Sequence, residues 1–163
     1  MTLANSCEHR ILVLGVGNTL LSDEGIGIHV AEALKSRPDL DPDIQVLDGG
    51  TLGLSLLPDV EDADALIVID AAQIYKQPGQ LRVFENSEMD QQLGGGKKRS
   101  AHELAVADLL AAAALAGHLP EDRALIAIQP SSIDWGLEPS TEVQQAIGQA
   151  CDAVTSLIER WKR

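Results

Sequence analysis

Four carboxylates stand where apolar runs end, and their types and positions could do chemistry. Asp23 and Glu24 follow the first run, Asp48 follows the second, and Asp70 closes the third. The carboxyl ends of parallel strands meet at one edge of a sheet, where open α/β folds bind their ligands. Carboxylates that meet there repel one another unless a cation lies between them. The pattern favours a cation site, although each acid alone could instead stabilise a helix N-terminus or form a turn.

His102 is a candidate nitrogen ligand for the same edge. It lies in the segment Ser100-Ala101-His102-Glu103, whose first and last residues have the spacing of a capping box. We therefore expect His102 in the first turn of a helix, where its side chain can lean toward the sheet. A neutral imidazole is a common transition-metal ligand. The alternative is an ordinary surface histidine in a polar turn. That alternative also applies to the other three histidines, His9, His29 and His118.

Better-known catalytic motifs are incomplete in this chain. Gly15-x-Gly17 is followed by Leu20, where a dinucleotide-binding fingerprint requires glycine, and no P-loop lysine follows. His102-Glu103 lacks the second histidine of HExxH, because Val106 occupies that position. We find no GxSxG elbow and no serine or cysteine recognisably paired with a base. One histidine with two carboxylates remains, a ligand set suited to a borderline first-row metal.

Five apolar runs predict the strands that position these residues. The strands are expected at 11–16, 44–47, 65–69, 81–84 and 124–128. Helical spacing predicts helices between Glu24 and Ser36, at 52–57 before Pro58, at 101–116, and from Val143 to Trp161. Residues 85–99, which end in LGGGKKR, are expected to form a flexible loop.

The order of these elements predicts an α/β fold. The strand at 81–84 follows the third after only about ten residues, fewer than the dozen or so that a parallel crossover needs, so we expect it to run antiparallel. The other strands alternate with helices. We therefore predict a single three-layer domain over residues 1–163, with a mostly parallel twisted sheet of about five strands and helices on both faces.

Composition limits the partners of this chain. Its 163 residues are 45% hydrophobic and carry a net charge of −13 without a basic block, which argues against nucleic acid and anionic membrane surfaces. No apolar run approaches the roughly 20 residues of a membrane span, and the N-terminus is not typical of a signal peptide. Cys7 and Cys151 form neither a CxxC motif nor a disulfide framework. We expect a reduced cytoplasmic protein, by default a monomer.

Several motifs follow one another in a fixed order between residue 11 and about residue 160. They are Leu14-Gly-Val-Gly-Asn18-Thr-Leu-Leu-Ser-Asp-Glu24-Gly-Ile-Gly27, Leu47-Asp48-Gly-Gly-Thr51-x-Gly53, Ile69-Asp70-Ala71, Pro78-Gly79 and Ser100-Ala-His102-Glu-Leu104. Each motif alone is weak, but the ordered set closely resembles the nickel–iron hydrogenase maturation endopeptidases. One departure is the basic, glycine-rich stretch at 94–99, which could mark a subgroup or a mobile loop.

The resemblance implies a function and a set of site residues. Members of this family remove a short C-terminal extension from the hydrogenase large-subunit precursor after nickel has been loaded. The implied metal ligands are Glu24, Asp70 and His102, and Asp48 is implied as a polar catalytic residue in a supporting position. The implied ion is the nickel carried by the precursor, which could polarise the scissile carbonyl and activate a water.

Two other classes of function stay open from the sequence. The first is a nickel-binding chaperone or checkpoint that recognises the loaded precursor without cutting it, since no standard nucleophile is present. The second is a plain α/β binding module whose acids meet at the sheet edge by accident. Loss of a C-terminal peptide from the precursor distinguishes a protease from the first alternative, and metal titration tests the second.

Overall fold

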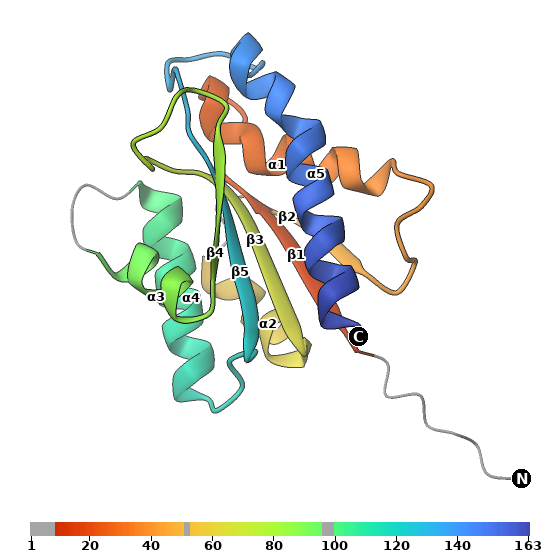
Figure 1. Cartoon of the computed structure of the whole chain (residues 1–163). Helices are drawn as coiled ribbons and strands as arrows, with labels where there is room; N and C mark the ends of the chain where they lie inside the picture. Colours follow the sequence, from red (N-terminus) through yellow and green to blue (C-terminus); the bar gives the residue numbers. More distant parts are fainter. Residues whose placement is uncertain (1–8, 51–52, 96–99) are drawn as a thin grey trace, which may run out of the picture.

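The computed structural model describes residues 9–50, 53–95 and 100–163 (Figure 1). Several sequence-based expectations lie outside these residues. They concern the N-terminal segment with Cys7, the turn at Thr51 and Leu52, and the basic residues 97–99. Among the described residues, no helix is long and apolar enough to cross a membrane.

A five-stranded sheet forms the middle layer, with the strand order β2-β1-β3-β5-β4. The strands are β1 (Ile11–Val16), β2 (Gln45–Gly50), β3 (Ala65–Ala71), β4 (Leu81–Glu85) and β5 (Asp122–Ile128). The first three and β5 pair in parallel, while β4 pairs antiparallel with β5. The predicted mostly parallel sheet and its antiparallel strand are both confirmed.

Helices cover both faces of this sheet (Figure 1). On one face lie α1 (Ile26–Lys35) and α5 (Thr141–Trp161), and on the other lie α2 (Leu57–Asp62), α3 (Ser87–Gly94) and α4 (Ala101–Leu115). Successive residues of β1 point to opposite faces: Ile11 packs with the α1 and α5 core, and Leu12 packs with the core under α4. The continuous apolar runs of β1, β3 and β5 are therefore explained by strands that are buried on both faces, whereas β2 and β4 lie at the edges of the sheet and are partly exposed.

The prediction of a flexible loop at 85–99 is wrong for most of its length, because Ser87–Gly94 forms α3. The segment is polar except for Met89 and Leu93, which stand four residues apart and are both buried. Residues at this spacing share one face of a helix, so two apolar side chains suffice to hold the helix on the core. The chain enters it through Asn86, which has a φ of 49°.

The expected helix end near Pro58 is also wrong. A 3-10 turn, η2 (Gly53–Leu56), leads directly into α2, which continues to Asp62. Pro58 lies in the first turn of α2, where a residue without an N–H group breaks no helical hydrogen bond.

Two strands extend further than expected toward the edge where the acids lie. The strand expected at 44–47 continues to Gly50 and so includes Asp48, and the strand expected at 65–69 continues to Ala71 and so includes Asp70. These acids are thus held by the sheet rather than by turns.

Candidate active site

Asp70 and His102 form a buried pair at the carboxyl edge of the sheet. Asp70 is the next-to-last residue of the central strand β3, and His102 lies in the first turn of α4, as predicted. The two residues are 2% and 5% exposed, and His102 Nδ1 lies 2.8 Å from Asp70 Oδ2. The predicted capping box fixes that turn, because Glu103 N donates to Ser100 Oγ and Ser100 N donates to Glu103 Oε2.

Glu24 joins this pair from the loop after β1. It lies in the 3-10 turn η1 (Ser22–Gly25), and its Oε2 atom is 3.9 Å from His102 Nε2. Gly17, at a φ of 133°, lets this loop fold back tightly, since a Cβ atom there would stand 1.9 Å from Glu24 O. Gly27 lets α1 approach the strand ends, since its Cβ would stand 2.1 Å from Ile69 O. The structure therefore brings together the three residues implied as ligands.

Burial and mutual contact shift the pKa values of both members of the pair. Burial raises the pKa of the Asp70 carboxyl to about 7, against the opposing effect of the His102 hydrogen bond. Burial opposes the imidazolium form of His102, yet the hydrogen bond and charge of Asp70, together with the charge of Glu24, raise its pKa. Groups perturbed in this way inside a buried pair are typical of catalytic sites.

Two polar atoms of the pair are buried without a hydrogen-bond partner among the described residues: Asp70 Oδ1 and His102 Nε2. Buried polar atoms are normally paired, so these two indicate a missing ligand. One nitrogen and nearby carboxylate oxygens suit a first-row transition metal. Within the part of the chain that the structure describes, however, no group of three His, Cys, Asp or Glu side chains is arranged to hold a metal ion already. The donor types fit a metal, and the assignment of ligands stays a prediction.

A carboxylate on the far nitrogen of a metal-binding histidine is a common arrangement. Asp70 Oδ2 takes this position on His102 Nδ1, which leaves Nε2 facing Glu24. Asp70 can therefore orient the imidazole as well as offer its own free oxygen.

The surroundings of Asp48 differ from those of the buried pair. It is an exposed residue of the edge strand β2, opposite Gly15 of β1, and its Oδ1 atom accepts a hydrogen bond of 2.9 Å from Gly50 N. This bond shapes the end of the strand. The catalytic role expected for Asp48 stays a prediction.

Comparison with known proteins identifies the family. A family model described as hydrogenase maturation protease matches residues 28–157. The chain belongs to the hydrogenase maturation protease family. The Hydrogenase 2 maturation protease of Escherichia coli is 39% identical over 150 residues, which cover 89% of this chain and 90% of the relative. HupD of Rhizobium leguminosarum, a hydrogenase expression/formation protein, is 39% identical over 153 residues, covering 93% and 75%.

Solved structures agree with this assignment. The hydrogenase maturating endopeptidase HybD from E. coli superposes with a TM-score of 0.86 at 36% identity and covers 93% of each chain. A NiFe hydrogenase maturation protease from Thermococcus kodakarensis gives 0.77 at 28% identity, covering 91% of this chain and 98% of its own. The prediction of a peptide-bond hydrolase with this fold is confirmed.

Asp23 has a role in this maturation protease that the sequence did not reveal. It is fully buried, and its carboxylate accepts hydrogen bonds from Ser131 N and Ser132 N at 2.8 and 2.9 Å, and from Ser140 N and Oγ at 2.6 and 2.9 Å. Burial alone would raise the pKa of Asp23, but these donors together lower it. Its oxygens are thus already engaged, and Asp23 ties η1 to the loop before α5. The serines of that loop were the only sequence signal.

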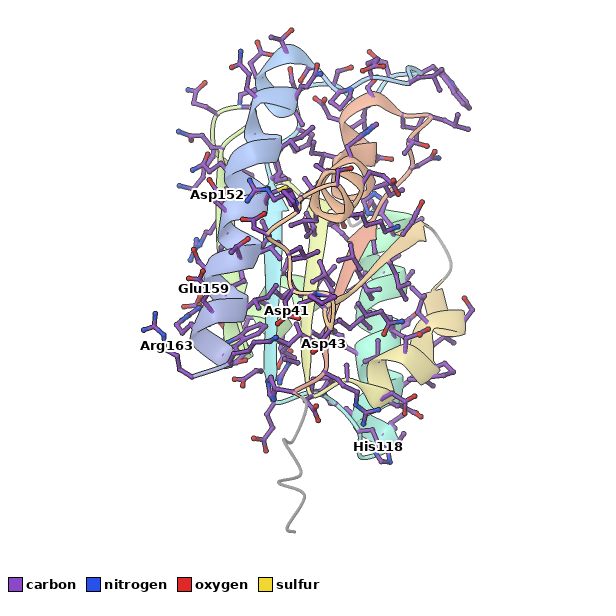
Figure 2. The ribbon with its side chains drawn as sticks, turned by 90° about the vertical axis from the view of Figure 1, so that its right-hand side faces the viewer. Asp41, Asp43, His118, Asp152, Glu159 and Arg163 are labelled. Carbon is purple, nitrogen blue, oxygen red and sulfur yellow. The ribbon has the colours of Figure 1, made fainter. Side chains whose placement is uncertain are left out.

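The other three histidines do not join the site. His29 belongs to α1, and His9 precedes β1. His118 follows α4 at the opposite end of the molecule from the strands' carboxyl ends (Figure 2). His118 is exposed, as the simpler interpretation expects, and offers a natural control for experiments on His102. His9 and His29 are instead half-buried, and the Nε2 atom of each is also buried without a partner among the described residues.

Proposed function

We propose that this chain is the endopeptidase that removes the C-terminal extension of a nickel-loaded NiFe hydrogenase large-subunit precursor. The observation that supports this proposal is the buried Asp70–His102 pair at the carboxyl edge of the sheet, whose unpaired His102 Nε2 lies 3.9 Å from Glu24 Oε2. The names of the relatives support the client class, since one is a Hydrogenase 2 maturation protease and another a NiFe hydrogenase maturation protease.

In this proposal nickel belongs to the substrate, and Glu24, Asp70 and His102 are the groups that meet it. The ion would supply Lewis-acid chemistry beside the scissile carbonyl and would activate a water. His102 presents Nε2 because Asp70 Oδ2 holds its Nδ1. Glu24 contributes negative charge on the Nε2 side of the imidazole ring. Asp48 is a supporting polar residue at the same edge.

The remaining parts of the proposal concern location and assembly. The protease acts as a cytoplasmic monomer when it is free of its client. Its negative charge of −13 and its single described sheet with helices on both faces are compatible with that setting.

The decisive experiment compares nickel-loaded and nickel-free precursor side by side, with the mass of each large subunit measured after incubation. We expect loss of a C-terminal peptide from the loaded form alone. Cleavage of both forms would remove nickel from the mechanism. Stable binding without any loss of mass would instead support the non-cleaving checkpoint.

Variants test the site itself. Glu24→Gln and His102→Ala are expected to keep their fold, as judged by circular dichroism, and to leave the loaded precursor intact. His118→Ala, at the far end of the molecule, is the matched control and should cleave normally. Full processing by both site variants would exclude these side chains from the reaction.

A further inference from the structure

Exposed apolar side chains gather on two loops beside the candidate active site. Leu20 is 49% exposed in the loop after β1, and Ile133, Trp135 and Leu137 are 57%, 82% and 69% exposed in the loop after β5. Trp135 is one of only two tryptophans in the chain. Large exposed side chains that lie together mark interaction sites more often than isolated ones do. We call these four residues the Trp135 surface.

Backbone hydrogen bonds hold the two loops side by side. Gly136 N donates to Leu20 O, and Ser22 N donates to Gly136 O, both at 2.9 Å, which makes a short parallel bridge. Ser22 Oγ adds a hydrogen bond of 2.7 Å to Asp134 O. The Asp23 carboxylate fixes the base of the same loop through its four hydrogen bonds. The Trp135 surface is thus built on a fixed frame, so docking on it costs little ordering entropy.

This frame adjoins the residues that meet the substrate. The turn that carries Ser22 also carries Glu24, and the second loop leaves β5 where Ile128 pairs with Ala71, the residue after Asp70. Figure 1 shows the blue segment before α5 passing beside the turn before α1. The loop that contributes Leu20 to the Trp135 surface therefore also carries Glu24, which places this surface next to one side of the candidate active site.

The charges beside the Trp135 surface indicate the chemistry of the partner that would bind there. The segment from 129 to 140 contains Asp134 and Glu138, both exposed, and no lysine or arginine. A partner chain with apolar side chains and nearby positive charge would match both properties.

We propose that the Trp135 surface docks an extended segment of the precursor next to the scissile bond, a segment with apolar side chains flanked by basic ones. This inference rests on the proposed function, since it names a binding surface for the same substrate. Trp135 is its anchor, because tryptophan is enriched among the residues that contribute most to binding.

The test is steady-state cleavage of purified nickel-loaded precursor by a Trp135→Ala/Leu137→Ala double variant. We expect KM to rise about tenfold while kcat stays within about twofold, since docking residues act on binding rather than on the bond that breaks. Trp135→Phe keeps an apolar ring and should retain most of the affinity. The melting temperature should not change, because both side chains are already exposed.

Leu115→Ala is the matched control. Leu115 is 92% exposed at the last residue of α4, about 20 Å along that helix from the His102 end. Its removal should leave KM unchanged.

The outcomes separate this inference from the proposed function. If the unaltered protein does not cleave the loaded precursor, the proposed function fails. If it cleaves, and the double variant shows the same KM, only the docking surface is overturned. A change in sedimentation with unchanged KM would assign the surface to a second copy of this chain instead.

Discussion

At the scale of single residues, the buried contact between Asp70 and His102 determines what the site can do. Asp70→Asn keeps the volume of the side chain and an oxygen that can accept from Nδ1, so the fold should survive. It removes the carboxylate that makes His102 a better ligand. We expect kcat/KM for the nickel-loaded precursor to fall by at least about 10- to 100-fold, because the loss of the orienting carboxylate alone has that cost and Asp70 also meets the ion in this proposal.

The control for this variant is Asp62→Asn, which alters an exposed carboxylate at the end of α2. It should cleave at the normal rate. An Asp70→Asn protein that cleaved as fast as the control would show that the carboxylate charge is irrelevant.

Asp23 predicts a pH dependence of stability. Its hydrogen-bond donors lower the pKa in the folded protein, so its contribution to stability is present above the unfolded value of about 4 and is lost as the pH falls through the folded value. Asp23→Asn replaces one acceptor oxygen by a donor that faces other donors. It should reduce the free energy of unfolding by about 2–3 kcal/mol at pH 7.

Urea unfolding at a series of pH values measures this effect. The difference between the unaltered protein and Asp23→Asn should shrink steadily as the pH falls below about 4. A difference that stays constant with pH would mean that the charge of Asp23 does not contribute.

Part of the site could be predicted from the residues themselves. Alternating strands and helices brought Asp70 to one sheet edge, and the capping box placed His102 in a first helical turn, both as observed. The choice of Glu24 over Asp23 came only from the resemblance, because adjacent acids look equivalent in a sequence. Their difference depends on donors more than a hundred positions away in the chain.

At the scale of elements, the close contact between α1 and the strand ends positions Glu24. A Cβ atom on Gly27 would stand 2.1 Å from Ile69 O and 2.4 Å from Val16 O, both backbone atoms that cannot move alone. Gly27→Ala should therefore push α1 away from the sheet, at a cost of about 3 kcal/mol or more. Cleavage should fall as well, since η1 moves with the helix.

Gly148→Ala provides the contrast within a helix. Nothing lies within 4 Å of a Cβ atom at this exposed position of α5, so alanine should stabilise the protein by up to about 1 kcal/mol. Thermal unfolding and a cleavage assay of both variants test whether close packing at Gly27 holds α1 against the sheet. Equal effects of the two substitutions would mean that the contact at Gly27 is not tight.

The elements differ in how far their sequences predict them. Strands buried on both faces give continuous apolar runs, and the short connection before β4 correctly predicted its direction. Helix α3 was missed because only Met89 and Leu93 signal its buried face, too few for a visible period. Strand β2 was predicted too short, because its last residues, Asp48-Gly49-Gly50, have the composition of a turn.

At the scale of the whole molecule, the excess negative charge is spread over many surfaces. Figure 2 shows Asp152 and Glu159 along α5 and Asp41 and Asp43 in the loop before β2, away from the site edge. Some of these acids are paired, as Asp152 is with Arg37 at 2.9 Å. The net charge of −13 could not by itself say where charge matters for function.

Two double variants with the same change in net charge can show which acidic residues affect binding of the precursor. Asp134→Asn/Glu138→Gln removes two charges beside the Trp135 surface, and Asp43→Asn/Glu159→Gln removes two exposed charges elsewhere. If acids next to the surface attract basic residues of the precursor, the first pair should raise KM about threefold at low salt, the size expected of exposed charge pairs. The second pair should change KM little.

Ionic strength provides the internal check on this comparison. The two double variants should converge as salt is added, because at 0.1 M exposed charges are screened beyond about 10 Å. Equal rises in KM for both pairs would point to a long-range effect of net charge. The precursor would then be attracted by the electric field of the whole protein rather than by the two acids beside Trp135. A local effect that disappears with salt would instead place a basic part of the client against this loop. A surface with an exposed tryptophan and flanking carboxylates is suited to bind such a segment.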